Sequence, residues 1–123
     1  DTVVICDGEV LGKPVDEADA IRMLKMLSGK THHVVTGVTL GRGCRYSSFS
    51  VDTAVTFREL SDQEIKAYVK SGEPMDKAGA YGIQGLGALL VEKIDGDFYN
   101  VVGLPVSRLA EELHEFLKKV QSK

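Results

Sequence analysis

The first part of the chain alternates between β-branched segments and one amphipathic segment. Residues 2–6 are β-branched or apolar throughout, which predicts a strand covered on both faces. Asp7-Gly8 predicts a tight turn directly after this strand. Between Asp16, which is suited to cap a helix, and Gly29, which is suited to end one, apolar residues recur at helical spacing. The pattern therefore predicts a strand, a hairpin turn and a helix.

Two further strands are predicted in the middle of the chain. Residues 31–40 contain a β-branched cluster, and residues 48–57 alternate between apolar and more polar positions, as in a strand with one buried face. The glycine-containing segment 41–45 between them is predicted to be a polar loop.

The last part of the chain has clearer helix signals. Ser61 and Glu64 have the spacing of a capping box and predict a helix that ends at Gly72. A glycine-rich loop then leads to a strand beginning at 89–91, and Asp95-Gly96 predicts a hairpin turn into a second strand at 98–102. Pro105 suits the first turn of a final helix with one apolar stripe. Because strands, hairpins and helices are mixed, we predict the α/β class with a sheet that is not purely parallel.

Composition limits the function classes. A chain of 123 residues is long enough for one domain with a core, and 1–123 is interpreted as a single domain. The net charge of −3 argues against a broad nucleic-acid-binding surface. Cys6 and Cys44 do not have the spacing of a metal or redox motif and are expected to be free thiols in a reducing compartment. No run approaches the length needed to span a membrane, so the cytoplasm is the expected location.

The glycine-rich segment 76–87, DKAGAYGIQGLG, indicates chemistry because glycines surround an acid, a base, a phenol and an amide. Alone, it would be interpreted as an ordinary glycine-rich turn. Together with three other segments it resembles the Maf family of nucleoside triphosphate pyrophosphatases. These segments are Asp1-Thr2-Val3-Val4, Leu11-Gly12-Lys13-Pro14 and Asn100-Val101-Val102-Gly103-Leu104-Pro105.

The resemblance implies an elongated mixed β-sheet flanked by helices, with a cleft and an architecture related to inosine triphosphatase. It covers nearly the whole chain and implies that 1–123 is the C-terminal two-thirds of a family member, whose first third precedes Asp1. The absent part would carry a serine–proline–arginine–arginine segment and an acidic site residue. A homodimer is also implied.

By resemblance, Asp1 is the metal ligand and the base that activates water, and Lys13 contacts phosphate. Without the resemblance, Lys13 would be interpreted as a solvated loop lysine. The resemblance gives phosphate binding to Lys77, a supporting role to Asp76, and base recognition to Gln84. Asp76 and Lys77 could otherwise be a surface ion pair of little worth.

Tyr81 and Gln84 resemble the branch of the family that acts on dTTP and UTP, with CTP as a further candidate. Thr53 matches a position near the base pocket, although a structural role on its strand stays open. Asn100 is interpreted as structural. His32 and His33 would point to opposite faces of a strand and could not share a metal ion, so His32 is expected to pack or to form a hydrogen bond.

The resemblance therefore implies a hydrolase of nucleotide metabolism that uses Mg²⁺ or Mn²⁺ to convert a nucleoside triphosphate to the monophosphate and pyrophosphate. The family is also linked to septum formation. The alternative is a catalytically inactive nucleotide-binding module or a regulator of cell division.

Overall fold

The computed structural model describes residues 1–121. A five-stranded sheet with the order β2-β1-β3-β4-β5 runs through the molecule, and every strand pair is antiparallel. The α/β class with a sheet flanked by helices is confirmed. The strands are β1 (Thr2–Cys6), β2 (Glu9–Leu11), β3 (Thr31–Arg42), β4 (Arg45–Phe57) and β5 (Val91–Asp95). The α-helices are α1 (Glu17–Leu27), α2 (Asp62–Lys70), α3 (Phe98–Val102) and α4 (Val106–Gln121), and the 3-10 helices are η1 (Glu73–Asp76), η2 (Ala78–Ala80) and η3 (Gly85–Leu90).

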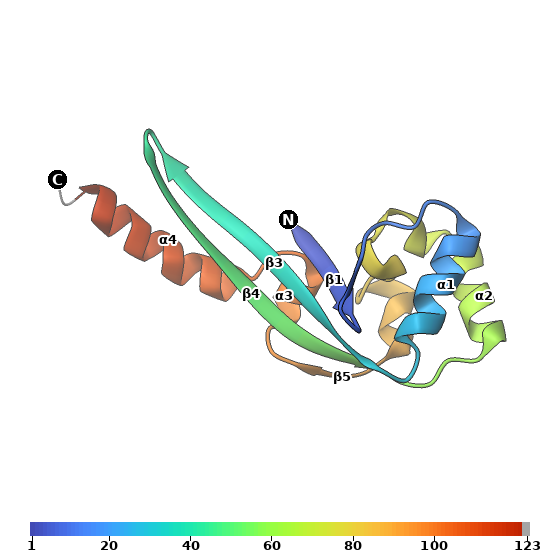
Figure 1. Cartoon of the computed structure of the whole chain (residues 1–123). Coiled ribbons are helices and arrows are strands. Elements are labelled where there is room, and N and C mark those ends of the chain that lie inside the picture. Colours follow the sequence, from blue (N-terminus) through green and yellow to red (C-terminus); the bar gives the residue numbers. More distant parts are fainter. Residues whose placement is uncertain (122–123) are drawn as a thin grey trace.

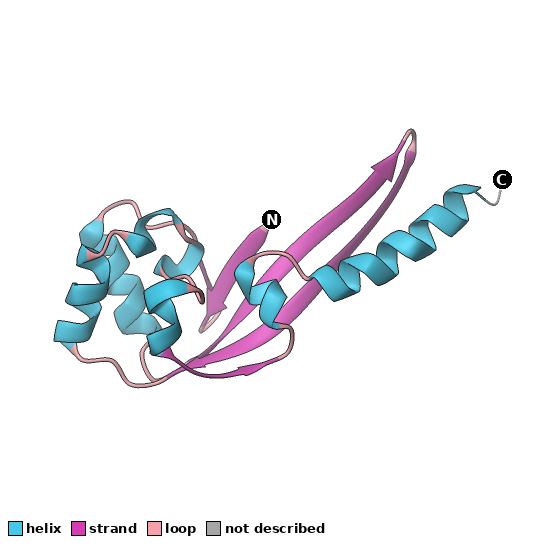
Figure 2. Cartoon of the chain, turned by 180° about the vertical axis from the view of Figure 1, so that it is seen from behind, coloured by secondary structure: helices cyan, strands magenta, loops and turns pink. Residues whose placement is uncertain are grey.

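The molecule has a helical end and an extended end (Figure 1). Helices α1 and α2 gather with the 3-10 helices at one end, where the buried core lies between them and β1, β3 and β4. The β3–β4 hairpin reaches away from this core, and α4 extends in the same direction (Figure 2). No helix within residues 1–121 combines the length and apolar character required to cross a membrane.

The predicted start of the chain is confirmed. Asp7 and Gly8 both have positive φ angles, 51° and 79°, and join β1 to β2 with Cys6 opposite Glu9. Two consecutive positive φ angles are typical of the tight turn that matches strand twist. Asp16 caps α1 by accepting a hydrogen bond from the Asp19 amide at 2.7 Å.

The capping box of α2 is also present. The Ser61 hydroxyl accepts from the Glu64 amide, and the Glu64 carboxylate accepts from the Ser61 amide. The described cysteines are free, Cys6 being buried and Cys44 exposed.

The predicted loop at 41–45 is wrong. Strand β3 continues to Arg42 and pairs directly with Arg45, so Gly43 and Cys44 form the whole turn. Glycine supplies the positive φ of 61° that this turn requires. Polar side chains can occupy these strand ends because the tip of the hairpin is exposed.

The predicted strand at 98–102 is wrong as well, because these residues form the short helix α3. The Asp97 side chain caps it by accepting from the amides of Tyr99 at 2.8 Å and Asn100 at 3.3 Å. The preceding strand begins at Val91 rather than Leu89, because 85–90 turn as a 3-10 helix.

The apolar stripe of α4 is only partly covered. Phe116 is buried, whereas Leu113 and Leu117 stay 41% and 36% exposed. The helix contacts the β3–β4 hairpin through Arg108, whose guanidinium lies 5.2 Å from the ring centre of Phe49 on β4.

Candidate functional site

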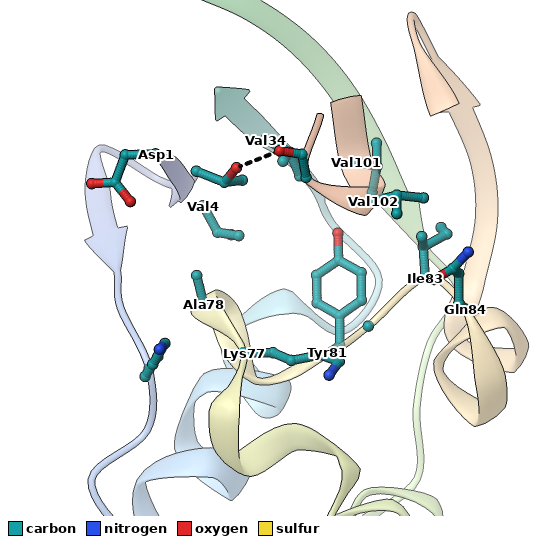
Figure 3. A pocket seen from close by; sticks show the side chains of 14 residues that line it. Asp1, Val4, Val34, Lys77, Ala78, Tyr81, Ile83, Gln84, Val101 and Val102 are labelled. Carbon is teal, nitrogen blue, oxygen red and sulfur yellow. Dashed lines mark hydrogen bonds between the residues drawn. The ribbon is translucent and has the colours of Figure 1, made fainter. Parts of the chain in front are cut away.

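A pocket of about 350 Å³ opens where β1, the glycine-rich segment and the end of α3 meet. Five of the predicted site residues line it: Asp1, Lys13, Lys77, Tyr81 and Gln84. Figure 3 shows Asp1 on one side and Gln84 on the other, with the side chains of Lys77 and Tyr81 between them. Segments more than sixty residues apart in the sequence therefore build one cavity with a carboxylate, two ammonium groups, a phenol and an amide.

The backbone brings the two lysine-bearing segments together. The Gly79 amide donates to the Gly12 carbonyl at 3.0 Å, which joins the residue before Lys13 to the glycine-rich segment. Gly79 has a φ of 72°. It also lies so close to Val4 that a Cβ on Gly79 would be 2.9 Å from Val4 Cγ2. Only glycine meets both conditions, so the close approach of these segments depends on it.

Asp76 lies beside the lysines but is not among the residues that line the pocket. Lys77 donates to the Asp76 carboxylate at 3.1 Å, and this hydrogen bond is the main reason why the pKa of Asp76 is lowered. The charge of Lys77, and to a smaller extent that of Lys13, acts in the same direction. Both ammonium groups therefore act on one small region, which is suited to an anion with several charges.

The aliphatic stem of Lys77 is held against the backbone of the same loop. A Cβ at Gly82 would lie 2.5 Å from Lys77 Cε, so glycine leaves the space that the lysine stem occupies. This packing positions the stem, and the hydrogen bond to Asp76 holds the ammonium group.

Tyr81 is fixed from behind by a buried histidine. Its hydroxyl lies 2.6 Å from His32 Nε2, and both rings pack edge-to-face with Phe57. Burial lowers the pKa of His32 from 6.5 to about 4, with a smaller contribution from His33, so the imidazole is neutral near pH 7. Burial also raises the pKa of Tyr81, which stays a phenol. The expectation that His32 packs and forms a hydrogen bond is confirmed.

Thr53 is not brought to the pocket. It is fully buried on β4, where its hydroxyl accepts hydrogen bonds from the Asn100 amide at 2.9 Å and from the Asp97 backbone at 3.1 Å. Asn100 also donates to the carbonyls of Val34 and Val51, at 3.0 Å each. The structural interpretation of Asn100 is confirmed, and the structure gives Thr53 the same kind of role beneath α3.

Residues 1–116 match the family described as Maf-like protein. The chain belongs to the Maf family. It is 56% identical over 116 residues to a protein of Bacillus velezensis (strain DSM 23117 / BGSC 10A6 / LMG 26770 / FZB42) named dTTP/UTP pyrophosphatase. The relatives of Bacillus pumilus (strain SAFR-032) and Bacillus cereus (strain AH820), which bear the same name, are 53% and 54% identical. Each match covers 94% of this chain and 61% of the relative, so the chain spans about three-fifths of the length of these Maf proteins.

Several lining residues of this Maf chain were not predicted individually. Thr2 lines the pocket, and its hydroxyl lies 3.0 Å from that of Thr36 and donates to the Gly103 carbonyl at 3.5 Å. Val101 and Val102 form part of the apolar wall. These residues fall within the segments that carry the family resemblance, so their place in the sequence was a usable signal.

The residues of the Maf pocket can hold a divalent cation only with help from a ligand. Within residues 1–121, no cluster of three or more metal-ligating side chains is present, and Asp1 is the carboxylate among the lining residues. Mg²⁺ commonly uses one or two protein carboxylates, completed by water and substrate phosphate oxygens. The donor set around Asp1 therefore fits Mg²⁺ or Mn²⁺ that arrives with a phosphate chain.

Proposed function

We propose that the protein hydrolyses the pyrimidine nucleoside triphosphates dTTP and UTP, with CTP as a further substrate, to the nucleoside monophosphate and pyrophosphate. The observation that carries the proposal is that Asp1, Lys13, Lys77 and Gln84 line the same pocket. The shared name of the relatives supports the choice of substrates.

The charges in the pocket match the needs of the reaction. A triphosphate carries several negative charges, and Lys13 and Lys77 supply two ammonium groups for its phosphate oxygens. A Mg²⁺ or Mn²⁺ ion held by Asp1 would neutralise further phosphate charge. The backbone that carries Lys13 is joined to the glycine-rich segment at Gly79, and the Lys77 stem lies against Gly82, so both lysines start from held segments.

The hydrolytic step requires a base near the α-phosphate. In the proposal, the Asp1 carboxylate accepts a proton from a water molecule as the water oxygen bonds to the α-phosphorus. The bond between the α-phosphorus and the bridging oxygen breaks, and pyrophosphate leaves with the electron pair. The lysines stabilise the charge that develops on these oxygens.

Base recognition belongs to the opposite side of the pocket. Gln84 is exposed at the rim, and its amide offers one acceptor and a donor group, which suits the paired donor and acceptor edge of a pyrimidine. Ile83 and Val102 supply apolar surface beside it. The proposal includes a homodimer that acts on free nucleotides in the cytoplasm and binds no nucleic acid or membrane.

Pyrophosphate release from dTTP, UTP, CTP and GTP with Mg²⁺ tests the function. Asp1→Asn is expected to reduce turnover by about a hundredfold or more, since a positioned general base contributes about 10² to 10⁴. Asp95→Asn, on the exposed strand β5, is the matched control and should keep full activity. Binding of UTP without release of pyrophosphate would reject the enzyme and support the inactive nucleotide-binding module instead.

A further inference from the structure

A carboxylate outside the pocket holds the glycine-rich segment. Glu73 begins η1 and accepts three hydrogen bonds, from the Tyr68 hydroxyl at 2.8 Å, the Gly87 amide at 3.0 Å and the Leu86 amide at 3.1 Å. Tyr68 in turn accepts from the Gly82 amide at 3.1 Å. Neither Glu73 nor Tyr68 lines the pocket, so this group acts only through the segment that it binds.

The two anchored ends enclose the residue proposed to read the base. Gly82 is held by Tyr68 on one side of Gln84, and Leu86 and Gly87 are held by Glu73 on the other. Gln84 itself is exposed, and its own backbone is extended. Its position is therefore set by the two anchors rather than by packing of its own side chain.

The packing around the anchors leaves little freedom. A Cβ at Gly87 would lie 1.7 Å from the Gly82 carbonyl oxygen, so the two ends of the segment touch backbone to backbone. A Cβ at Gly85 would lie 3.0 Å from Glu73 Oε2. The segment is wrapped closely around the carboxylate, and only small residues fit there.

The Glu73 carboxylate also belongs to the element that directly precedes Lys77, one of the two lysines proposed to bind phosphate. Helix η1 runs from Glu73 to Asp76, and Lys77 follows it directly. Burial opposes ionisation of Glu73, but the hydrogen bonds from Tyr68, Gly87 and Leu86, together with the charge of Lys77, lower its pKa. Charged acceptors form the stronger hydrogen bonds, so the ionised Glu73 carboxylate holds the glycine-rich segment firmly beside Lys77.

We infer that Glu73 and Tyr68 are positioning residues that clamp the segment from Gly82 to Gly87 and thereby set base selectivity at Gln84. The inference rests on the proposed function for its ligand. It assigns the discrimination between bases to a hydrogen-bond group behind the pocket, while phosphate binding depends on the two lysines.

The decisive comparison uses a ligand with a base and a ligand without one. Dissociation constants for UTP, GTP and inorganic tripolyphosphate are measured with Mg²⁺ for the protein and for Glu73→Gln and Tyr68→Phe. Each variant is expected to weaken UTP binding about tenfold and to reduce the preference for UTP over GTP by a similar factor, because hydrogen bonds to a charged acceptor are lost or weakened. Tripolyphosphate binding should stay within about threefold, since the lysines remain. Glu92→Gln and Tyr46→Phe remove the same groups at exposed positions and should change nothing.

Amide exchange tests the clamp without any ligand. In both variants, the amides whose acceptor is lost or loses its charge should exchange faster: those of Leu86 and Gly87 in Glu73→Gln, where a single neutral carbonyl oxygen replaces the two carboxylate oxygens, and that of Gly82 in Tyr68→Phe. Equal weakening of UTP and tripolyphosphate, unchanged UTP preference, or unchanged exchange would overturn the inference. A protein that releases no pyrophosphate from UTP rejects the proposed function instead, and the exchange rates still decide whether the clamp exists.

Discussion

Acidification should destabilise this fold through one buried imidazole. His32 is 0% exposed, and its pKa falls from 6.5 to about 4 because burial disfavours the charged ring. The unfolded chain therefore binds a proton at His32 more readily than the folded chain does. Linkage gives the sign: the free energy of unfolding has its full value, as far as His32 is concerned, above about pH 6.5. It decreases as the pH falls from about 6.5 to about 4.

The size of the loss follows from the two pKa values. A difference from 6.5 to about 4 corresponds to at most about 3 kcal/mol, at about 1.36 kcal/mol per pH unit. At pH 5, about 2 kcal/mol of this is lost relative to pH 8. Domains are stable by about 5 to 15 kcal/mol, so the effect is a substantial fraction of the free energy of unfolding.

Carboxylates lose their stabilising contribution in a different range. The pKa of Glu64 is lowered to about 2, mainly by the hydrogen bond from Arg58, so its contribution disappears between about pH 4.5 and 2. Measurements between pH 7.5 and 5 therefore report chiefly on the histidine.

Urea unfolding at several pH values between 7.5 and 5 measures the effect, with the slope m as a check that the transition stays two-state. His33→Gln is the matched control, because His33 is the exposed neighbour on the same strand and pairs with Asp52. This variant should keep the pH dependence, whereas His32→Gln should lose it. NMR titration of the His32 ring supplies a second measurement if the latter variant folds poorly. A ring that titrates near pH 6.5, or a free energy of unfolding that does not change above pH 5, would refute the reasoning.

Three further predictions concern the frame of the site. Asn100→Ala should lower the free energy of unfolding by about 3 kcal/mol, measured by urea unfolding, because buried acceptors on β3 and β4 lose their donor. Gly87→Ala should lower the free energy of unfolding by about 3 kcal/mol or more, because its Cβ cannot avoid the Gly82 carbonyl. Gly12→Ala is the control, because nothing lies within 4 Å of its Cβ, and it should change this free energy by no more than about 1 kcal/mol. Similar urea midpoints for the two variants would contradict this prediction. Lys77→Ala should weaken tripolyphosphate binding about tenfold, measured by calorimetry, and an unchanged dissociation constant would remove Lys77 from the phosphate site.

Local signals in the sequence were sufficient for the elements whose ends are capped. Asp16, Ser61 and the Asp7-Gly8 turn each act through hydrogen bonds or dihedral angles within a few residues, so they could be predicted without the fold. Strand alternation likewise separated the buried His32 from the exposed His33.

Contacts between distant segments were out of reach. The apolar stripe of α4 predicted a buried face, but the hairpin beside it covers Phe116 and leaves Leu113 over a third exposed. The Glu73 clamp was missed for the same reason, because Leu86 and Gly87 lie thirteen and fourteen residues after Glu73, around a loop whose path the sequence does not reveal.

The error at 98–102 explains why part of the pocket wall was missed. Valine and aromatic residues favour a strand in this segment, but the Asp97 cap and the hydrogen bonds of Asn100 with β3 and β4 outweigh that preference. In a strand, alternate side chains would face opposite ways, and only one of Val101 and Val102 could reach the cavity. In the short helix, Asn100 points into the sheet while both valines and Gly103 reach the pocket. The buried amide thus selects the local structure and places the wall of the site through the same hydrogen bonds.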